Sequence, residues 1–364
     1  MKITAAVLRE QAQPFTLEEL DLEDPRADEV VVRVVGVGIC HTDLTVRDRP
    51  TTPRPAVLGH EGAGVIERVG KGVTRVQPGD HVVLSWGSCG TCRHCQRGLP
   101  AYCPKRSAYT MACTRLDGST CLRRQGEVVH SHFFGQSSFA SHALASEDTV
   151  IKVDTDLPLA LLGPLGCGVQ TGAGAVLNTL RPRVGSSLAV FGVGPVGMSA
   201  IMAAAISGCT TIIAVDVKPN RLELALAFGA THTINADDTD PVAAIRQLTD
   251  GGADYTLDTS GVPAVLRQAV DSLTRLGVCG LIGLAGPGAE VRLEMSQLLQ
   301  GRILRGIIQG DSVPNLFIPL LIDLYRQGRF PFDRMAAYYP LEQINQAATD
   351  SVSGAAMKPV LRVG

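Results

Sequence analysis

Four cysteines with metal-ligand spacing set the first chemical expectation for this chain. They follow the pattern Cys-x2-Cys-x2-Cys-x7-Cys and occupy Cys89, Cys92, Cys95 and Cys103. Four soft thiolates at such short spacings predict a tetrahedral zinc site with no open position, which holds a loop together rather than performing chemistry. A disulfide pair or an iron–sulfur cluster is the competing interpretation. Zinc is favoured because nothing else in the chain suggests electron transfer.

The second motif is a glycine-rich turn between an apolar strand and a helix. Residues 188–191 run into Gly192-Val-Gly194-Pro-Val-Gly197, and residues 198–207 favour a helix. In this pattern the first glycine allows the turn, the second lets the backbone approach a pyrophosphate, and the third packs the helix on the strand. The amides at the helix start then bind the pyrophosphate. The glycine pattern alone is a weak signal, and the strand–turn–helix context strengthens it.

An acidic residue at the end of the next predicted strand favours NAD over NADP. Asp216 lies about 20 residues beyond Gly197, the separation at which a carboxylate bonds the adenosine ribose hydroxyls. A carboxylate there would also repel a 2′-phosphate. A solvated strand end is the alternative interpretation of Asp216, and Lys218 and Arg221 are nearby cations that would accommodate a phosphate.

Three further candidate ligands are dispersed along the chain. Cys40 precedes His41-Thr42-Asp43, His60 precedes Glu61, and Cys167 lies between two glycines. Taken singly, a cysteine is more often a small buried hydrophobe, and a lone histidine is more often a satisfied polar group. Spacing alone does not select these three residues as one site.

The elements that must position these residues fall into two patterns. In the first 160 residues or so, short β-segments at 30–37, 64–69 and 81–84 are separated by glycine and proline, and no helical period dominates. After residue 183, apolar runs alternate with helical stretches. Continuous apolar strands between helices predict a parallel sheet covered on both faces. The predicted strands are residues 188–191, 211–215, 231–234, 255–257, 278–282 and 303–308, and further helices are expected at 315–326 and near 341–349.

Composition limits the possible partners. The chain has 364 residues, and its net charge of -2 provides no general field for nucleic acid or an anionic membrane. The segment 184–215 has no charged residue, but its glycines fit a strand, a turn, a helix and a second strand better than a membrane helix. Four of the ten cysteines are clustered as metal ligands rather than dispersed as disulfide pairs. Together with an N-terminus without a signal-peptide pattern, this predicts a reducing, cytoplasmic location.

In their order along the chain, these motifs resemble those of the zinc-dependent medium-chain alcohol dehydrogenases. The resemblance is carried by Gly-Ile-Cys40-His41-Thr42-Asp43, by Gly-His60-Glu61-Gly-Ala-Gly, by the four cysteines and by the glycine-rich turn, and it spans nearly the whole chain. It implies an α/β fold. A GroES-like, β-rich catalytic domain would comprise residues 1–168 and 309–364, with a structural zinc lobe at 87–104. A Rossmann domain with a doubly wound parallel sheet would comprise residues 169–308.

The resemblance also implies roles for single residues. It makes Cys40, His60 and Cys167 the catalytic zinc ligands, and the four-cysteine cluster the ligands of a structural zinc. Near the catalytic zinc, Thr42 would contact the substrate hydroxyl, Asp43 would support His60, and Glu61 would lie beneath the metal. For the cofactor, His41 and Lys358 would contact the diphosphate and Thr171 the nicotinamide. The other implied NAD-binding residues are Gly192, Gly194, Gly197, Asp216 and Arg221.

The implied chemistry is a hydride transfer. Two thiolates and a neutral imidazole cancel the charge of Zn2+ and leave a fourth position, where an alcohol oxygen would have a lowered pKa. Its proton would leave through the Thr42 hydroxyl, and hydride would pass to NAD. Many family members continue this proton path with a histidine three residues later, where this chain has Thr45. We therefore expect a different exit for the proton, through ribose hydroxyls and water.

Within the family, several segments are similar to bacterial aryl (benzyl) alcohol dehydrogenases. They are residues 133–139, 161–174 and 330–333. This similarity implies a primary aromatic, allylic or terpenoid alcohol as substrate. Trp86 and Phe139 are candidate pocket residues that would stack on a flat substrate, with ordinary core packing as the alternative.

Two other functions remain open at this point. One is a glutathione-dependent formaldehyde dehydrogenase acting on S-hydroxymethylglutathione. The other is a non-enzymatic sensor of redox state that binds zinc and NAD, although a sensor needs no open zinc position. The resemblance further implies a homodimer or homotetramer that associates through the strand near residues 303–308, because an exposed apolar edge favours strand pairing.

Overall fold

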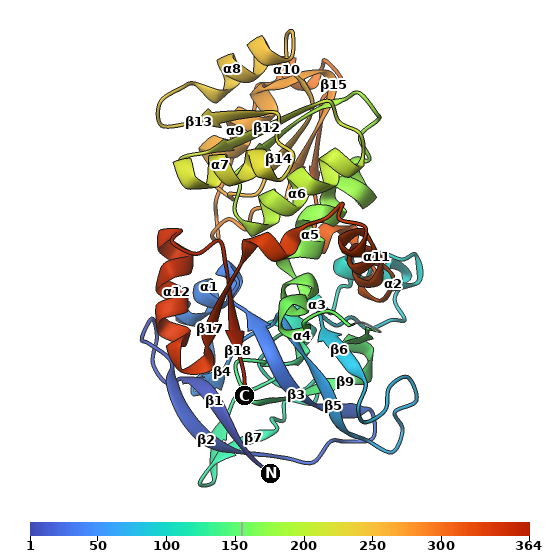
Figure 1. The fold of residues 1–364 in the computed structure, drawn as a ribbon, viewed down its shortest axis with the longest axis vertical. Helices are drawn as coiled ribbons and strands as arrows, with labels where there is room; N and C mark the ends of the chain where they lie inside the picture. The colour runs from blue at the N-terminus through green and yellow to red at the C-terminus, as the bar shows by residue number, and fades with distance from the viewer. Residues whose placement is uncertain (154–155) are drawn as a thin grey trace. The chain divides into compact units, whose positions relative to one another are not determined.

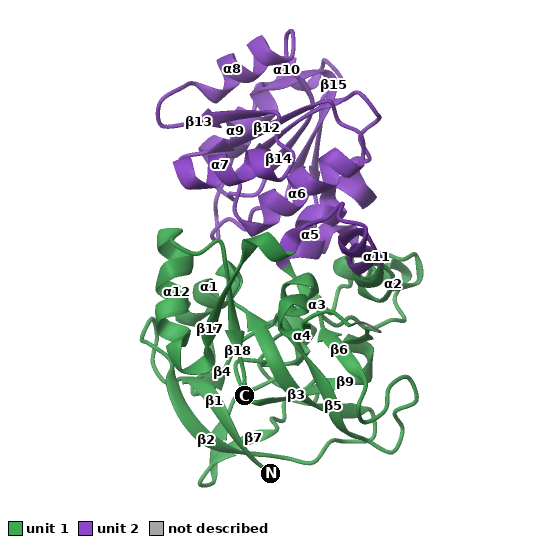
Figure 2. Ribbon diagram, in the orientation of Figure 1, with its two compact units in different colours: residues 1–167, 313–319, 333–364 green, residues 168–312, 320–332 purple. Residues whose placement is uncertain are grey.

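The computed structural model describes residues 1–153 and 156–364 and divides into two compact units. Unit 1 comprises residues 1–167, 313–319 and 333–364, and unit 2 comprises residues 168–312 and 320–332 (Figure 2). Each unit has a buried apolar core of its own. The predicted combination of a β-rich part with a parallel-sheet part is confirmed.

Unit 1 is built on two largely antiparallel sheets. One has the strand order β4-β1-β2-β7-β8, and the other has the order β10-β6-β5-β3-β18-β17 with β9 also paired to β3. The strands are β1 Lys2–Leu8, β2 Thr16–Leu22, β3 Glu29–Gly38, β4 Ala56–Val57, β5 Gly62–Val69, β6 His81–Leu84, β7 Leu122–Arg124, β8 Glu127–Val129, β9 His142–Ser146, β10 Val150–Lys152, β17 Ala336–Pro340 and β18 Lys358–Arg362. Strand β3 is central, and Val30, Val31 and Val32 are all buried, which explains why its apolar residues are consecutive.

The chain returns to unit 1 at its C-terminal end. Figure 1 shows β18, in red, beside the blue strand β3, and these strands pair antiparallel with Val360 opposite Gly38. The helices of unit 1 are α1 His41–Asp48, α2 Arg93–Gln96, α3 Arg106–Thr110, α4 Leu159–Leu162 and α12 Ile344–Ser353. The first four are too short to produce a helical period in the sequence. The last helix was expected near 341–349; it begins at Ile344, after a 3-10 turn over Leu341–Gln343.

Unit 2 contains a six-stranded sheet in which all neighbouring strands are parallel. Its order is β13-β12-β11-β14-β15-β16, which confirms the predicted doubly wound sheet. The strands are β11 Ser187–Phe191, β12 Thr211–Asp216, β13 His232–Asn235, β14 Ala253–Asp258, β15 Leu273–Leu281 and β16 Ile303–Gly306. The helices, seen around the sheet in Figure 1, are α5 Gly168–Gly174, α6 Pro195–Ile206, α7 Pro219–Ala227, α8 Pro241–Leu248, α9 Pro263–Asp271 and α10 Met295–Leu298, and α11 Pro314–Arg326 has residues in both units.

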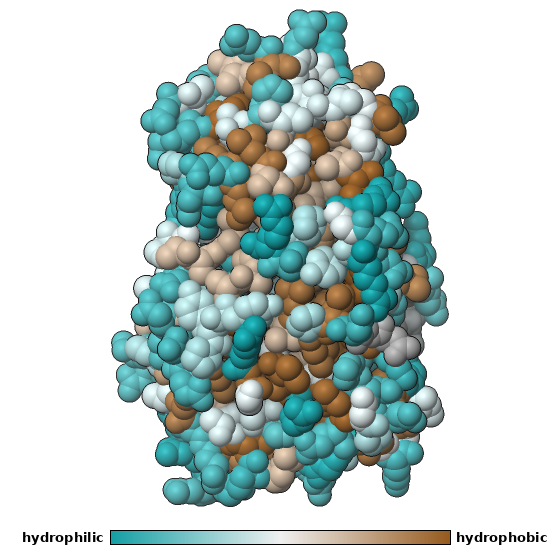
Figure 3. Space-filling model, in the orientation of Figure 1, coloured by the Kyte–Doolittle hydropathy of each residue, from teal (hydrophilic) through white to brown (hydrophobic). Residues whose placement is uncertain are grey.

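Apolar helices in the described residues are short. No single helix there is both long enough and apolar enough to cross a membrane. One bent pair, Leu159–Gly166 followed by Gly168–Leu180, passes that test by length and composition alone. On the face drawn in Figure 3, hydrophilic side chains are interspersed with apolar ones.

Arg115 and Glu29 form a buried ion pair in unit 1. The guanidinium Nε and Nη2 donate to the two Glu29 oxygens at 2.6 and 3.0 Å. Burial alone would raise the pKa of the Glu29 carboxyl, but His132, Arg115 and the Arg26 N–H outweigh it and lower the pKa to about 2 from its ordinary 4.5. Because the folded-state pKa is depressed, this carboxylate stabilises the fold above about pH 5, and the contribution is lost as the pH falls toward 2.

We predict that Arg115→Met lowers the free energy of unfolding at pH 7 by about 3–5 kcal/mol, because Glu29 would remain as a buried charge without its bidentate partner. Urea unfolding followed by circular dichroism measures the change. The double variant Arg115→Met/Glu29→Gln should recover most of the loss. Equal stability of the single and double variants would contradict the assignment.

Candidate metal and nucleotide sites

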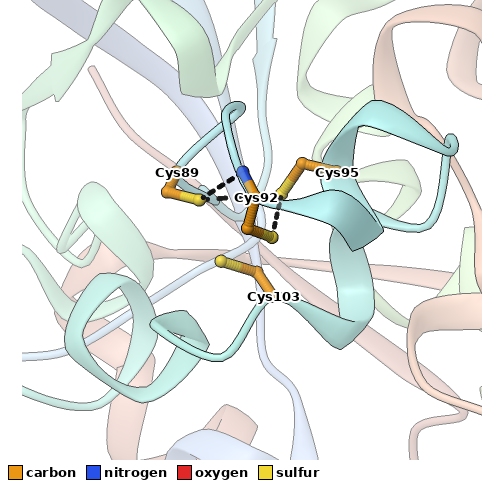
Figure 4. Close-up of side chains that lie close together, drawn as sticks. All are labelled: Cys89, Cys92, Cys95 and Cys103. Carbon is orange, nitrogen blue, oxygen red and sulfur yellow. Dashed lines mark hydrogen bonds between the residues drawn. The ribbon is translucent and has the colours of Figure 1, made fainter.

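The four cysteines predicted as a structural metal site converge in unit 1. The sulfurs of Cys89, Cys92, Cys95 and Cys103 point toward one another (Figure 4), and all lie within 4.8 Å of one another. The Cys92–Cys95 and Cys89–Cys95 sulfur distances are 3.5 and 4.0 Å. A tetrahedral site with Zn–S bonds of about 2.3 Å needs sulfurs about 3.8 Å apart. The cluster therefore fits a zinc ion, and backbone hydrogen bonds from Thr91 and Cys92 lower the pKa of Cys89 to about 6.

A second donor set is assembled from three separate parts of unit 1. Cys40 stands just before α1, His60 and Glu61 just before β5, and Cys167 after the 3-10 turn Gly163–Gly166. One donor atom from each of these four residues lies within 4.8 Å of the others. His60 and Glu61 are almost completely buried, with exposures of 1% and 0%. The structure thus brings together the three dispersed candidates that spacing alone did not select.

The orientation of His60 is set by Asp43. The ring Nδ1 lies 2.8 Å from Asp43 Oδ1, which also accepts from the Gly59 N–H at 3.2 Å. The other carboxylate oxygen accepts from the Cys40 N–H at 2.9 Å. Since a carboxylate accepts, the hydrogen-bonded ring nitrogen is the donor, and the lone pair of Nε2 is available to a metal. Nε2 is buried and, within the described part of the chain, has no hydrogen-bond partner.

The electrostatics of this set favour a cation. Burial opposes a charge on the His60 ring, but Asp43 and Cys40 outweigh it and raise its pKa to about 10. The pocket therefore attracts positive charge, which a divalent ion would supply while the imidazole stays neutral. Two thiols and one imidazole are also the donors of a Cys2His catalytic zinc site, of which alcohol dehydrogenase is a standard example. The residues fit zinc.

Glu61 is paired with Lys358 from β18. The Lys358 Nζ lies 2.5 Å from Glu61 Oε2 and donates to the Ile39 carbonyl at 3.0 Å. Burial alone would lower the pKa of Lys358, but the charges of Glu61 and Cys40 raise it. The family resemblance implied diphosphate contact for Lys358, which stays a prediction, and the ammonium contacts Glu61. His41, the other predicted diphosphate residue, is exposed at the start of α1.

Thr42 and Thr45 both lie in α1 but have different surroundings. Thr42 lies in the first turn of α1 and is half-buried. It directly precedes the buried Asp43 and comes two residues after the half-buried Cys40. The Thr45 hydroxyl donates to the His41 carbonyl at 3.0 Å, within the helix. Its only proton is therefore already donated to the backbone, and the expected exit of the substrate proton through ribose hydroxyls and water stays a prediction.

The glycine-rich turn of unit 2 has the geometry of a dinucleotide site. Gly192 has φ +83°, and α6 begins directly after Gly194. A Cβ on Gly197 would lie 2.1 Å from the Gly192 carbonyl oxygen, so only glycine lets the helix pack on the turn. Asp216, at the end of β12, accepts from the Val193 N–H at 2.8 Å. The carboxylate thus organises the turn from the neighbouring strand.

Two further predicted cofactor residues also lie in unit 2. An Nη of Arg221 lies 3.7 Å from Asp216 Oδ2 and 4.0 Å from the position a Cβ would occupy on Gly194. The cation therefore stands beside the glycine-rich turn. Thr171, in α5, donates its hydroxyl proton to Gln309 Oε1 at 3.0 Å, and both side chains are buried.

The aromatic candidates for the pocket are buried in unit 1. Trp86 is 4% exposed, and Phe139 is fully buried and packs edge-on against Phe15 with ring centroids 5.7 Å apart. The sequence analysis missed Phe133 and Phe134, whose rings contact the His60 imidazole. Both belong to the segment 133–139, which was noted only for its similarity, and nothing in the sequence indicated a contact with His60.

Comparisons with known proteins agree with this geometry. Residues 26–155 match the family of the alcohol dehydrogenase GroES-like domain, and residues 195–325 match the zinc-binding dehydrogenase family. A geraniol dehydrogenase from Castellaniella defragrans is 45% identical over 360 residues, which cover 98% of this chain and 96% of that protein. This chain belongs to the zinc-binding alcohol dehydrogenases. The GroES-like fold expected for the β-rich part is thereby confirmed.

Solved structures extend the match over the full length. A benzyl alcohol dehydrogenase from Acinetobacter calcoaceticus shares 46% identity with a TM-score of 0.97, and the alignment covers 100% of both chains. A zinc-binding-domain alcohol dehydrogenase from Burkholderia ambifaria shares 55% identity with a TM-score of 0.98, covering 100% of this chain and 99% of that one. As a member of this family, the dehydrogenase uses zinc and a nicotinamide dinucleotide.

We predict that Gly197→Ala in this dehydrogenase weakens binding of the nicotinamide dinucleotide by about tenfold or more, because the added methyl group would displace α6 from the glycine-rich turn, and the amides at a helix start in this motif bind a pyrophosphate. Fluorescence titration with NADH measures the effect. Gly286→Ala is the matched control, since a Cβ there meets nothing within 4 Å. An unchanged dissociation constant in Gly197→Ala would contradict this role of the turn.

Proposed function

We propose that this zinc alcohol dehydrogenase interconverts primary aromatic or allylic alcohols, of benzyl or terpenoid type, and their aldehydes with NAD. The observation that carries the proposal is the donor set of Cys40, His60 and Cys167, in which Asp43 leaves the buried His60 Nε2 free for a metal. The substrate class is supported by the geraniol and benzyl alcohol dehydrogenases to which the chain is similar.

In this proposal the residues of unit 1 have separate roles in metal binding, proton transfer and substrate contact. Zinc held by Cys40, His60 and Cys167 would supply Lewis-acid polarisation of the substrate oxygen. The Thr42 hydroxyl would accept the alcohol proton while it gives up its own proton, which would leave through the ribose hydroxyls and water. Asp43 keeps the His60 ring in the tautomer that leaves Nε2 unprotonated. Glu61, neutralised by Lys358, supports the site from beneath. Trp86 and Phe139 remain our candidates for contact with a flat substrate.

The cofactor assignments follow the two described clusters and the glycine-rich turn. We propose two zinc ions per chain, one at the catalytic donor set and one at the four cysteines. NAD would bind at Gly192, Gly194 and Gly197, with Asp216 and Arg221 at the adenosine ribose, His41 and Lys358 at the diphosphate, and Thr171 at the nicotinamide. The catalytic domain would comprise residues 1–168 and 309–364, and the cofactor domain residues 169–308.

Assembly and location are proposed on two observations. Ile303, Leu276 and Leu299 are 53%, 77% and 87% exposed at or near the edge strand β16, which supports a homodimer or homotetramer formed through that edge. None of the ten cysteines forms a disulfide in the part of the chain that the structure describes, and six of them belong to the two candidate metal clusters, which supports a reducing compartment such as the cytoplasm.

We expect zinc-replete protein with NAD to oxidise benzyl alcohol and geraniol with a kcat/KM at least about tenfold above that for ethanol, because the larger apolar body adds binding energy in the transition state. NADH formation measures the rates. A preference for S-hydroxymethylglutathione would favour the glutathione-dependent formaldehyde dehydrogenase instead. No turnover of any alcohol would favour the redox sensor.

We expect Asp216→Asn to raise kcat/KM for NADP relative to NAD by about tenfold, because the side chain no longer repels a 2′-phosphate. The amide loses the backbone hydrogen bonds of one carboxylate oxygen, to Val193 or to Val217 and Lys218, so the ratio of the two cofactors is compared rather than the absolute rate. Steady-state rates with each cofactor measure the ratio. Asp323→Asn makes the same change of charge at an exposed position of α11 and should leave the ratio unchanged. A ratio unaffected by Asp216→Asn would show that this carboxylate does not select the cofactor.

A further inference from the structure

One buried side chain, Gln136, forms hydrogen bonds with the main chain at His60 and at Gly62. Its Nε2 donates to the His60 carbonyl at 3.0 Å, and its Oε1 accepts from the Gly62 N–H at 3.1 Å. A carbonyl only accepts and an N–H only donates, so these partners fix the orientation of the amide. The Ser138 hydroxyl donates to the same Oε1 at 3.0 Å. Gln136 is 1% exposed, so water does not replace these bonds.

Two neighbouring rings hold the imidazole itself. Phe134 stacks on the His60 ring with centroids 4.3 Å apart and planes 25° apart, and Phe133 meets it edge-on at 5.4 Å and 90°. The Asp43 hydrogen bond restrains rotation of the imidazole in its own plane. The aromatic contacts restrain its tilt. Gln136 adds a third restraint, on the main chain from which the ring projects.

The segment that supplies these contacts has an unusual backbone. His132, Phe134 and Ser137 have φ values of +65°, +52° and +51°, a region that non-glycine residues rarely occupy. The Ser137 hydroxyl donates to the Val57 carbonyl at 2.6 Å and accepts from the Phe133 N–H at 2.9 Å. Such conformations persist only where surrounding contacts fix them, and they concentrate at functional sites.

We propose that Gln136, with Phe134, is a positioning residue for the catalytic metal and acts through His60. The inference rests on the proposed metal site at Cys40, His60 and Cys167. Gln136 touches neither the metal ligands' donor atoms nor the reacting groups. Its effect is to hold the main chain of His60, so that Nε2 stays directed at the position shared with the two thiolates.

The test uses the full-length protein loaded with Co2+, whose visible absorption reports the geometry of its ligands. Gln136→Met keeps the length of the side chain and removes all three hydrogen bonds of the amide. We expect the catalytic metal to be released to a chelator about tenfold faster, as is typical when a partner behind a ligating histidine is lost. Its absorption bands should shift, while release from the four-cysteine cluster stays unchanged. Phe134→Leu should have a smaller effect of the same kind.

Two controls separate positioning from general destabilisation. Tyr339→Phe removes a hydroxyl that donates to Asp350 Oδ2 at 2.8 Å, between β17 and α12 of unit 1, and it should lower the melting temperature without changing the spectrum or either release rate. Cys40→Ala identifies the catalytic phase, because it should bind one metal fewer. Two metals in Cys40→Ala would overturn the proposed metal site. One metal fewer there, with a wild-type spectrum and release rates in both Gln136→Met and Phe134→Leu, would overturn only the positioning role.

Discussion

The metal site depends on one buried carboxylate that joins two distant segments. Asp43 accepts a hydrogen bond from the Cys40 N–H with one oxygen, and with the other it binds the His60 ring and the Gly59 N–H. The first and second proposed ligands, Cys40 and His60, are therefore fixed to the same group. Because Asp43 is fully buried, no water competes for these bonds, and its charge can be balanced only by the donors around it and by a cation in the site.

The two metal clusters show what sequence reasoning can and cannot find. Cys89 to Cys103 form a site within one short segment, so their spacing already limits their separation in space, and the geometry followed the prediction. Cys40, His60 and Cys167 are brought together by β5, α1 and the turn before α5, which no local pattern encodes. Only the resemblance to a family predicted them. Gln136 was missed because it acts on the main chain of His60, and a glutamine in a loop carries no signal of such a contact.

The fold was predictable where burial is uniform along an element. The central strands β11 and β12 of unit 2 are apolar and buried along most of their length because helices cover the sheet, and they were predicted to within one residue at either end. In unit 1 the short helices α1 to α4 were not predicted from the sequence, since four to eight residues contain too few turns for an apolar period. These short helices nevertheless carry Thr42, Asp43 and the loop of the cysteine cluster. The elements hardest to predict are therefore the ones that position the chemistry.

The return of the C-terminal strand to unit 1 has an electrostatic reason. Glu61 is completely buried beside the metal ligands, and a buried carboxylate without a partner is strongly destabilising. Strand β18 pairs with β3 and thereby places Lys358 on Glu61 and on the Ile39 carbonyl, next to Cys40. Gly38 leaves the necessary space, since a Cβ there would lie 2.1 Å from Glu61 Oε2. The carboxylate beneath the metal site is thus tolerated because the last strand of the chain supplies its counter-charge.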